Sequence, residues 1–111
     1  MDKNTSQLLR RHNDPPLLLL TSLAAGPKHG YALLKDVEQF AGVTLSPGTL
    51  YGAITRLEEL GLIEPMEGVD RRRPYRITAN GTQVLRDVTK EMRRLADVGL
   101  TRLRLSTGGA R

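Results

Sequence analysis

The apolar residues in the first half of the chain recur three or four positions apart, the spacing that gathers them on one face of a helix. The first such segment, 14–25, begins with Asp14, a helix-capping residue, and a proline suited to the first turn. It ends at a glycine and a proline, because glycine adopts the left-handed conformation and proline cannot continue a helix. Segments 29–41 and 47–60 have the same periodicity, and each ends at or next to a glycine. The pattern therefore predicts three successive helices joined by short turns.

Each helix has an apolar face that we expect to form the core of the domain. In the second helix this face consists of Leu33, Leu34, Val37 and Phe40, and in the third it consists of Leu50, Ala53, Ile54, Leu57 and Leu60. Tyr31 and Tyr75 are expected to be packing residues rather than residues that stack on bases, since aromatic rings dominate the packing of cores.

The pattern changes after Gly61 to short segments with the alternation of strands. Segments 62–66 and 75–78 flank a polar stretch and predict a small hairpin. Thr78 is expected to cap a long final helix over 79–105, followed by a frayed tail over 106–111. Three helices, a hairpin and a further helix are the element order of a winged helix-turn-helix, a mainly α member of the α+β class.

Composition restricts the class of function. The 111 residues include 17 Lys and Arg against 12 Asp and Glu, a formal net charge of +5 that is compatible with a polyanionic partner. The chain has no cysteine, a polar beginning and no apolar run of the roughly 20 residues that a membrane span needs, so we expect a cytoplasmic protein. Two isolated histidines and no phosphate-binding or hydrolase motif leave little support for an enzyme, a metal or a cofactor.

The polar face of the third predicted helix is suited to a DNA groove. It combines small residues, hydroxyls, one aromatic ring and one cation, and its first two turns carry no acid. With the capping residue, the candidate contacts are Ser46, Gly48, Thr49, Tyr51, Gly52, Thr55 and Arg56. Small side chains allow close approach, and the free N–H groups of the helix N-terminus favour an anion.

The hairpin tip supplies a second group of candidates. It carries Arg71, Arg72 and Arg73, with Arg76 on the strand that follows. Arginines in this position can pair with phosphates or enter a narrow minor groove. Lys28 and His29, at the start of the second helix, could hold the DNA backbone beside the third. Each feature alone is ordinary in a solvated surface, but together they occur in the order that a winged helix requires.

Four segments together resemble the PadR family of transcriptional regulators. They are Leu45-Ser46-Pro47-Gly48-Thr49-Leu50-Tyr51, His29-Gly30-Tyr31-Ala32-Leu33, residues 56–63 and Arg72-Arg73-Pro74-Tyr75-Arg76-Ile77-Thr78 with Gly81. The resemblance implies a regulator that reads double-stranded DNA with the third helix and the wing and dimerises through its C-terminal helix. It also implies repression of nearby genes until a small-molecule effector binds. By position, Ser46, Thr49, Tyr51, Thr55 and the arginines at 71–73 take the DNA-contacting roles.

The single C-terminal helix resembles the short branch of that family. Some members of this branch bind planar, hydrophobic or cationic compounds between subunits, using aromatic residues of that helix. The final helix of this chain has no aromatic residue, and Met92 lies among aliphatic neighbours. A stacked aromatic effector is therefore not expected here.

The final predicted helix has an apolar seam that favours a homodimer. The seam residues are Leu85, Val88, Met92 and Leu95, with Leu103 further along. A helix over 79–105 measures about 40 Å at a rise of about 1.5 Å per residue, more than a small domain covers. A two-fold dimer would present two recognition helices to half-sites about 34 Å apart on a palindromic operator. The predicted organisation is an arm over 1–13, a DNA-binding domain over 14–78, a dimerisation helix over 79–105 and a flexible tail.

The alternative from another class is a winged-helix module that docks on a protein and does not read DNA. A stable partner over the third helix would favour it. Internal pairing of the arginines at 71–73 with Glu64, Glu67 and Asp70 would favour it as well.

Overall fold

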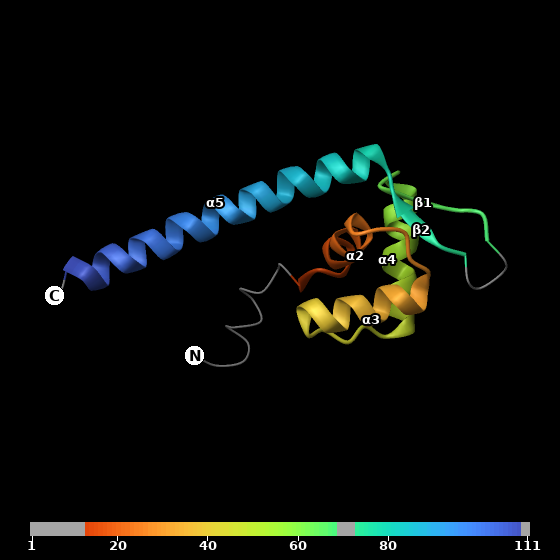
Figure 1. The fold of residues 1–111 in the computed structure, drawn as a ribbon, viewed down its shortest axis with the longest axis horizontal. Helices are drawn as coiled ribbons and strands as arrows, with labels where there is room; N and C mark the ends of the chain where they lie inside the picture. Colours follow the sequence, from red (N-terminus) through yellow and green to blue (C-terminus); the bar gives the residue numbers. More distant parts are fainter. Residues whose placement is uncertain (1–12, 69–72, 110–111) are drawn as a thin grey trace.

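The computed structural model describes residues 13–68 and 73–109, with side chains given up to residue 106. In chain order the elements are α2 (Pro15–Ala24), α3 (Gly30–Ala41), α4 (Pro47–Glu59), β1 (Ile63–Pro65), β2 (Tyr75–Ile77) and α5 (Ala79–Gly109). This mainly helical fold with a two-stranded sheet confirms the predicted fold class (Figure 1). The proposed arm before Asn13 and the tip residues Arg71 and Arg72 lie outside the described residues.

The helix boundaries follow local signals. The Ser46 hydroxyl accepts from the N–H of Thr49 and caps α4, and the Thr78 hydroxyl accepts from the N–H of Gly81 at the start of α5. Gly42 ends α3 in the left-handed conformation. Asp14 stands at the cap position of α2, but its side chain makes no capping hydrogen bond. Proline in the first turn of α2 removes N–H groups that such a cap would satisfy.

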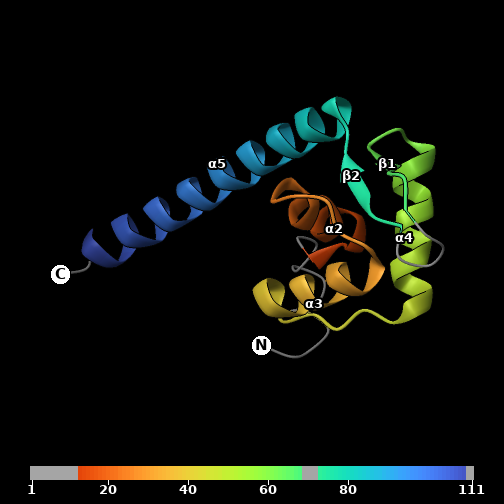
Figure 2. The same ribbon diagram turned by 45° about the vertical axis from the view of Figure 1, so that its right-hand side comes forward.

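α2 lies at the centre of the domain and packs on α3, α4, α5 and β2 (Figure 2). The core consists of Leu18, Leu19, Leu20, Leu23, Leu33, Val37, Leu45, Leu50, Ala53, Ile54, Leu57 and Ile63. This confirms most of the two predicted apolar faces and extends them with the aliphatic run of α2.

Three expectations about packing are wrong. Phe40 is exposed because it lies in the last turn of α3, beyond Val37, the last buried residue of that helix. Leu60 is exposed at the end of α4, where it faces a groove rather than the core. Tyr31 is 66% exposed on the side of α3 opposite the core, with the Lys35 ammonium 5.7 Å above its ring. Tyr75, by contrast, packs against the core as expected.

The hairpin and the first turn of α5 pack closely against the segment that follows α4. β1 and β2 pair antiparallel, with Glu64 opposite Arg76. The carbonyl of Leu62 accepts from the N–H of Thr78, and a Cβ atom at Gly81 would lie 2.0 Å from the oxygen of that carbonyl. Only glycine therefore lets the first turn of α5 approach the end of α4 this closely.

α5 leaves the domain as a single long helix. Its 31 residues correspond to about 46 Å. It continues to Gly109, so the predicted end at Leu105 is wrong by four residues, because the terminal glycines keep a helical backbone. Of the seam residues, Leu85 packs on the chain's own core. Within 13–68 and 73–109, no helix is long and apolar enough to cross a membrane.

Candidate nucleic-acid interface

The polar face of α4 is open to solvent along its whole length. All seven candidates from Ser46 to Arg56 are exposed, whereas Leu50, Ala53, Ile54 and Leu57 on the opposite face are buried. Gly48 and Gly52 leave open space, because a Cβ atom at either position would meet no atom within 4 Å. The fold therefore does not need these glycines, and each lowers the stability of a helix by about 0.5–1 kcal/mol relative to alanine.

The hydroxyl groups on this face have defined directions. The Ser46 hydroxyl donates to Thr49 Oγ1 at 2.9 Å, which leaves the Thr49 hydroxyl hydrogen for an external acceptor. The Thr55 hydroxyl donates to the carbonyl of Tyr51 at 2.9 Å, so Thr55 presents lone pairs and a methyl group. Thr49 can thus act as a donor at the groove, and Thr55 as an acceptor or an apolar contact.

Tyr51 links α4 to the start of α3. A Cβ atom at Gly30 would lie 2.6 Å from the Tyr51 hydroxyl oxygen, so the ring lies against the first turn of α3. The ring remains half exposed. The pKa of the Tyr75 hydroxyl is raised above its ordinary value. Burial is the main cause, the nearby Glu58 and Tyr51 add to it, and the positive charge of Arg73 offsets part of the shift. Tyr51 thus packs against the first turn of α3 and also belongs to the exposed face.

The hairpin stands beside α4, and both ribbon views place the two at the same end of the molecule (Figures 1 and 2). Arg73 is exposed at the edge of the tip. Arg76 pairs with Glu64 across the strands, with Nη2 2.6 Å from Oε1, and both side chains remain about half exposed. Arg71 and Arg72 belong to the undescribed part of the tip, and their contacts with Glu67 or Asp70 cannot be described.

Lys28 and His29 have roles inside the domain. The Lys28 ammonium points into the molecule, where it donates to the carbonyl of Ser22 at 2.6 Å. His29 caps α3, and its Nδ1 accepts from the N–H of Ala32 at 3.4 Å.

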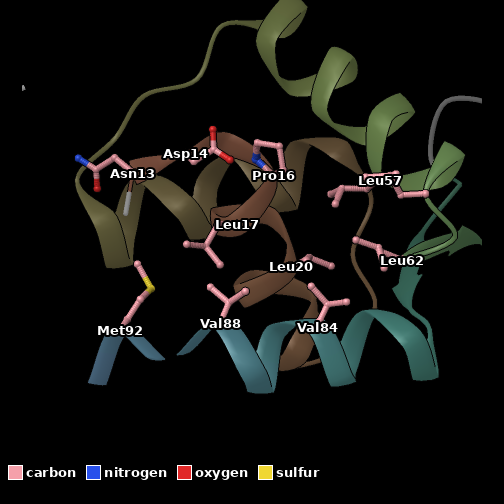
Figure 3. Close-up of a pocket in the computed structure, with 11 residues that line it drawn as sticks. Asn13, Asp14, Pro16, Leu17, Leu20, Leu57, Leu62, Val84, Val88 and Met92 are labelled. Atoms are coloured by element: carbon pink, nitrogen blue, oxygen red, sulfur yellow. The ribbon is translucent and has the colours of Figure 1, made fainter. Parts of the chain in front are cut away.

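An apolar groove of about 860 Å³ lies between α2, the end of α4 and α5. Leu17 and Leu20 of α2 point across it toward Val84, Val88 and Met92 of α5 (Figure 3). The sequence pattern places Val88 and Met92 in the dimer seam, with a contribution from the N-terminal helix, but it does not identify which residues of that helix line the groove. A continuous apolar run such as 17–20 gives no sign of which residues face the core and which face a groove.

Three comparisons place the chain among known proteins. Residues 19–87 match the model of the transcriptional regulator PadR-like family. A 37.1 kDa protein in transposon TN4556 of Streptomyces fradiae is 44% identical over 86 residues, which are 78% of this chain and 25% of that protein. The chain spans 25–38% of the length of the curated relatives it matches.

Two solved structures are similar over most of their length. A PadR family transcription regulator from Clostridium difficile R20291 is 27% identical with a TM-score of 0.71, and the match covers 83% of this chain and 98% of that one. A PadR family regulator from Eggerthella lenta DSM 2243 is 34% identical with a TM-score of 0.69, covering 90% of this chain and 89% of that one.

Proposed function

Because the chain belongs to the PadR-like family of transcriptional regulators, we propose that it binds a specific double-stranded DNA operator as a homodimer. The observation that carries this proposal is the exposed polar face of α4 with the hairpin beside it. In a winged helix the recognition helix enters the major groove, and basic residues of the wing contact the backbone or the minor groove. Action on chromosomal DNA would place the protein in the cytoplasm.

The dimer is supported by the exposed apolar surface of α5. Leu95 is 75% exposed, and Val88 and Met92 line the adjoining groove. A monomer would leave this surface in water, whereas a second copy would bury it in a two-fold interface. The seam proposed for this interface comprises Val88, Met92, Leu95 and Leu103, with Leu85 shared with the core.

Repression is the regulatory outcome that we propose. A dimer that covers two half-sites about 34 Å apart occupies DNA that RNA polymerase would otherwise contact. The groove next to the seam could admit an apolar effector, which would then compete with the partner subunit. A reporter fused to the protein's own promoter should be expressed more strongly when the gene is deleted, and lower expression would contradict repression.

Titration against the promoter of its own operon tests the DNA-binding proposal. Fluorescence anisotropy or electrophoretic mobility should give much tighter binding to one site than to a scrambled duplex. Micromolar, sequence-blind binding at every salt concentration would instead support the alternative of a protein-interaction module.

Replacing Arg71, Arg72 and Arg73 together with alanine should weaken binding to every sequence. Each phosphate contact contributes about 0.9 to the slope of log affinity against log salt, so losing three in each subunit of the proposed dimer should reduce the slope by about 5.4. Titrations between low and moderate salt measure this change. A variant with an unaltered slope would show that the tip does not contact phosphate.

Gly52→Ala should separate DNA affinity from stability. We expect the free energy of unfolding to rise by about 0.5–1 kcal/mol, because alanine favours the helix and its Cβ atom meets nothing. Operator affinity should fall by about tenfold or more, because the methyl group occupies space into which the duplex fits. Urea denaturation and anisotropy measure the two quantities. Undiminished affinity would exclude close approach of DNA at this position.

A further inference from the structure

Lys28 lies where α2, α3 and the hairpin meet. Its backbone N–H donates to the carbonyl of Tyr75 at 3.1 Å, and the N–H of Tyr75 donates to the carbonyl of Lys28 at 2.9 Å. On its other edge β2 pairs with β1, and just beyond the strands the carbonyl of Pro74 accepts from the N–H of Met66. Lys28 thus supplies a third strand, one residue long, that holds the hairpin against the helices.

The side chain of Lys28 fixes this strand to α2 and α3. Its ammonium donates to the carbonyls of Ser22 and Gly26 at 2.6 and 3.4 Å, and it lies 3.9 Å from Oδ2 of Asp36. The buried Ser22 hydroxyl donates to the same Oδ2 at 2.6 Å. The ammonium therefore occupies the C-terminal end of α2, where unpaired carbonyls and the helix dipole favour a cation.

A lysine has three N–H donors; two of them are directed at carbonyls, and the Asp36 carboxylate lies 3.9 Å away, within ion-pair range. The side chain is only 20% exposed. A phosphate contact would require the ammonium to leave Asp36 and the end of α2, so the ion pair and both hydrogen bonds to carbonyls would be lost. The geometry thus argues against the phosphate contact expected from the sequence.

We propose that Lys28 is a positioning residue, whose side chain sets where the hairpin stands relative to α4. The positioning role of Lys28 does not depend on the proposed DNA binding. Its functional consequence rests on that proposal, because a displaced hairpin no longer aligns Arg73 with the duplex that α4 contacts. The Lys28→Met variant keeps the aliphatic stem and removes the ammonium. Lys90→Met removes the same charge from an exposed position on α5 and serves as the matched control.

Hydrogen exchange of the protein without DNA tests the positioning role directly. In Lys28→Met the amide of Tyr75 should exchange about tenfold faster or more, because its bond to the Lys28 carbonyl opens locally. Amides within α4, such as that of Leu57, should keep their protection, and Lys90→Met should change neither. Uniform loss of protection across the core, or no change at Tyr75, would overturn the proposal.

DNA titration distinguishes positioning from direct contact. Lys28→Met should bind the operator about tenfold more weakly, and any reduction of its salt slope should disappear once Arg73 is already alanine, whereas a direct phosphate contact by Lys28 would lower the slope in both backgrounds by about 0.9 per subunit. Combined with Arg73→Ala, its effect should be smaller than the sum of the two, because Lys28 acts through the hairpin. Strict additivity, or a slope that Lys28→Met reduces equally in the parent and in the Arg73→Ala background, would overturn the proposal. If the parent protein binds no operator, the proposed function fails and hydrogen exchange still decides the role of Lys28.

Discussion

Gly81→Ala is expected to lower the free energy of unfolding by about 3 kcal/mol, the upper end of the range for overpacking. The new Cβ atom would lie 2.0 Å from the carbonyl oxygen of Leu62 and 2.8 Å from Cγ1 of Ile77. The carbonyl cannot easily retreat, because it accepts from the N–H of Thr78 at 3.0 Å. The first turn of α5 must therefore move away from the end of α4. Urea denaturation followed by circular dichroism measures the loss.

Gly52→Ala is the matched control, since it adds the same methyl group to an exposed helix with no atom in reach. It should raise stability where Gly81→Ala lowers it. If the Gly81→Ala variant is as stable as the parent, the first turn of α5 does not lie as close to the Leu62 carbonyl as the structure shows, and the prediction is wrong.

Leu95→Asp is expected to convert the proposed dimer into a monomer. Leu95 is 75% exposed in the single chain, so the monomer should fold normally, but the proposed interface would bury the new carboxylate without a partner. The dimer dissociation constant should rise by about 100-fold or more, and affinity for a palindromic operator should fall with it. Light scattering over a range of concentrations measures the mass, and anisotropy measures the affinity.

Thr101→Asp provides the control on the same helix. Thr101 is also exposed, but it lies about 120° around the helix from Leu95 and opposite Met92. Introducing the same charge there should leave the dimer intact. Dissociation by both variants, or by neither, would contradict the interface proposed along Val88, Met92 and Leu95.

Much of the fold was predictable because its signals are local. The periodicity of 47–60, the cap at Ser46 and the left-handed glycine at position 42 act within a few residues of the elements they define. The exposed face of α4 follows from the same periodicity, since burying one side of an amphipathic helix presents the other to solvent. The polar residues there could be named before any coordinates were known.

The errors and omissions concern contacts between residues distant in the sequence. Phe40 has the spacing of a core residue, yet it is exposed, because burial depends on whether another element covers that turn. Lys28 resembles a surface cation until its partners Ser22 and Asp36 are known, and these come from two different helices. In the sequence Gly81 cannot be distinguished from any other helical glycine. Only the tertiary structure brings the Leu62 carbonyl against it.

The sequence by itself determined the order and type of the elements, the inner and outer faces of α4 and the family of the chain. Only the tertiary structure decided which cation holds the hairpin, why position 81 is glycine and where α2 and α5 leave an apolar groove. The physical reason is range: caps, turns and periodicity act over a few residues, whereas these three features arise when separate elements are packed together.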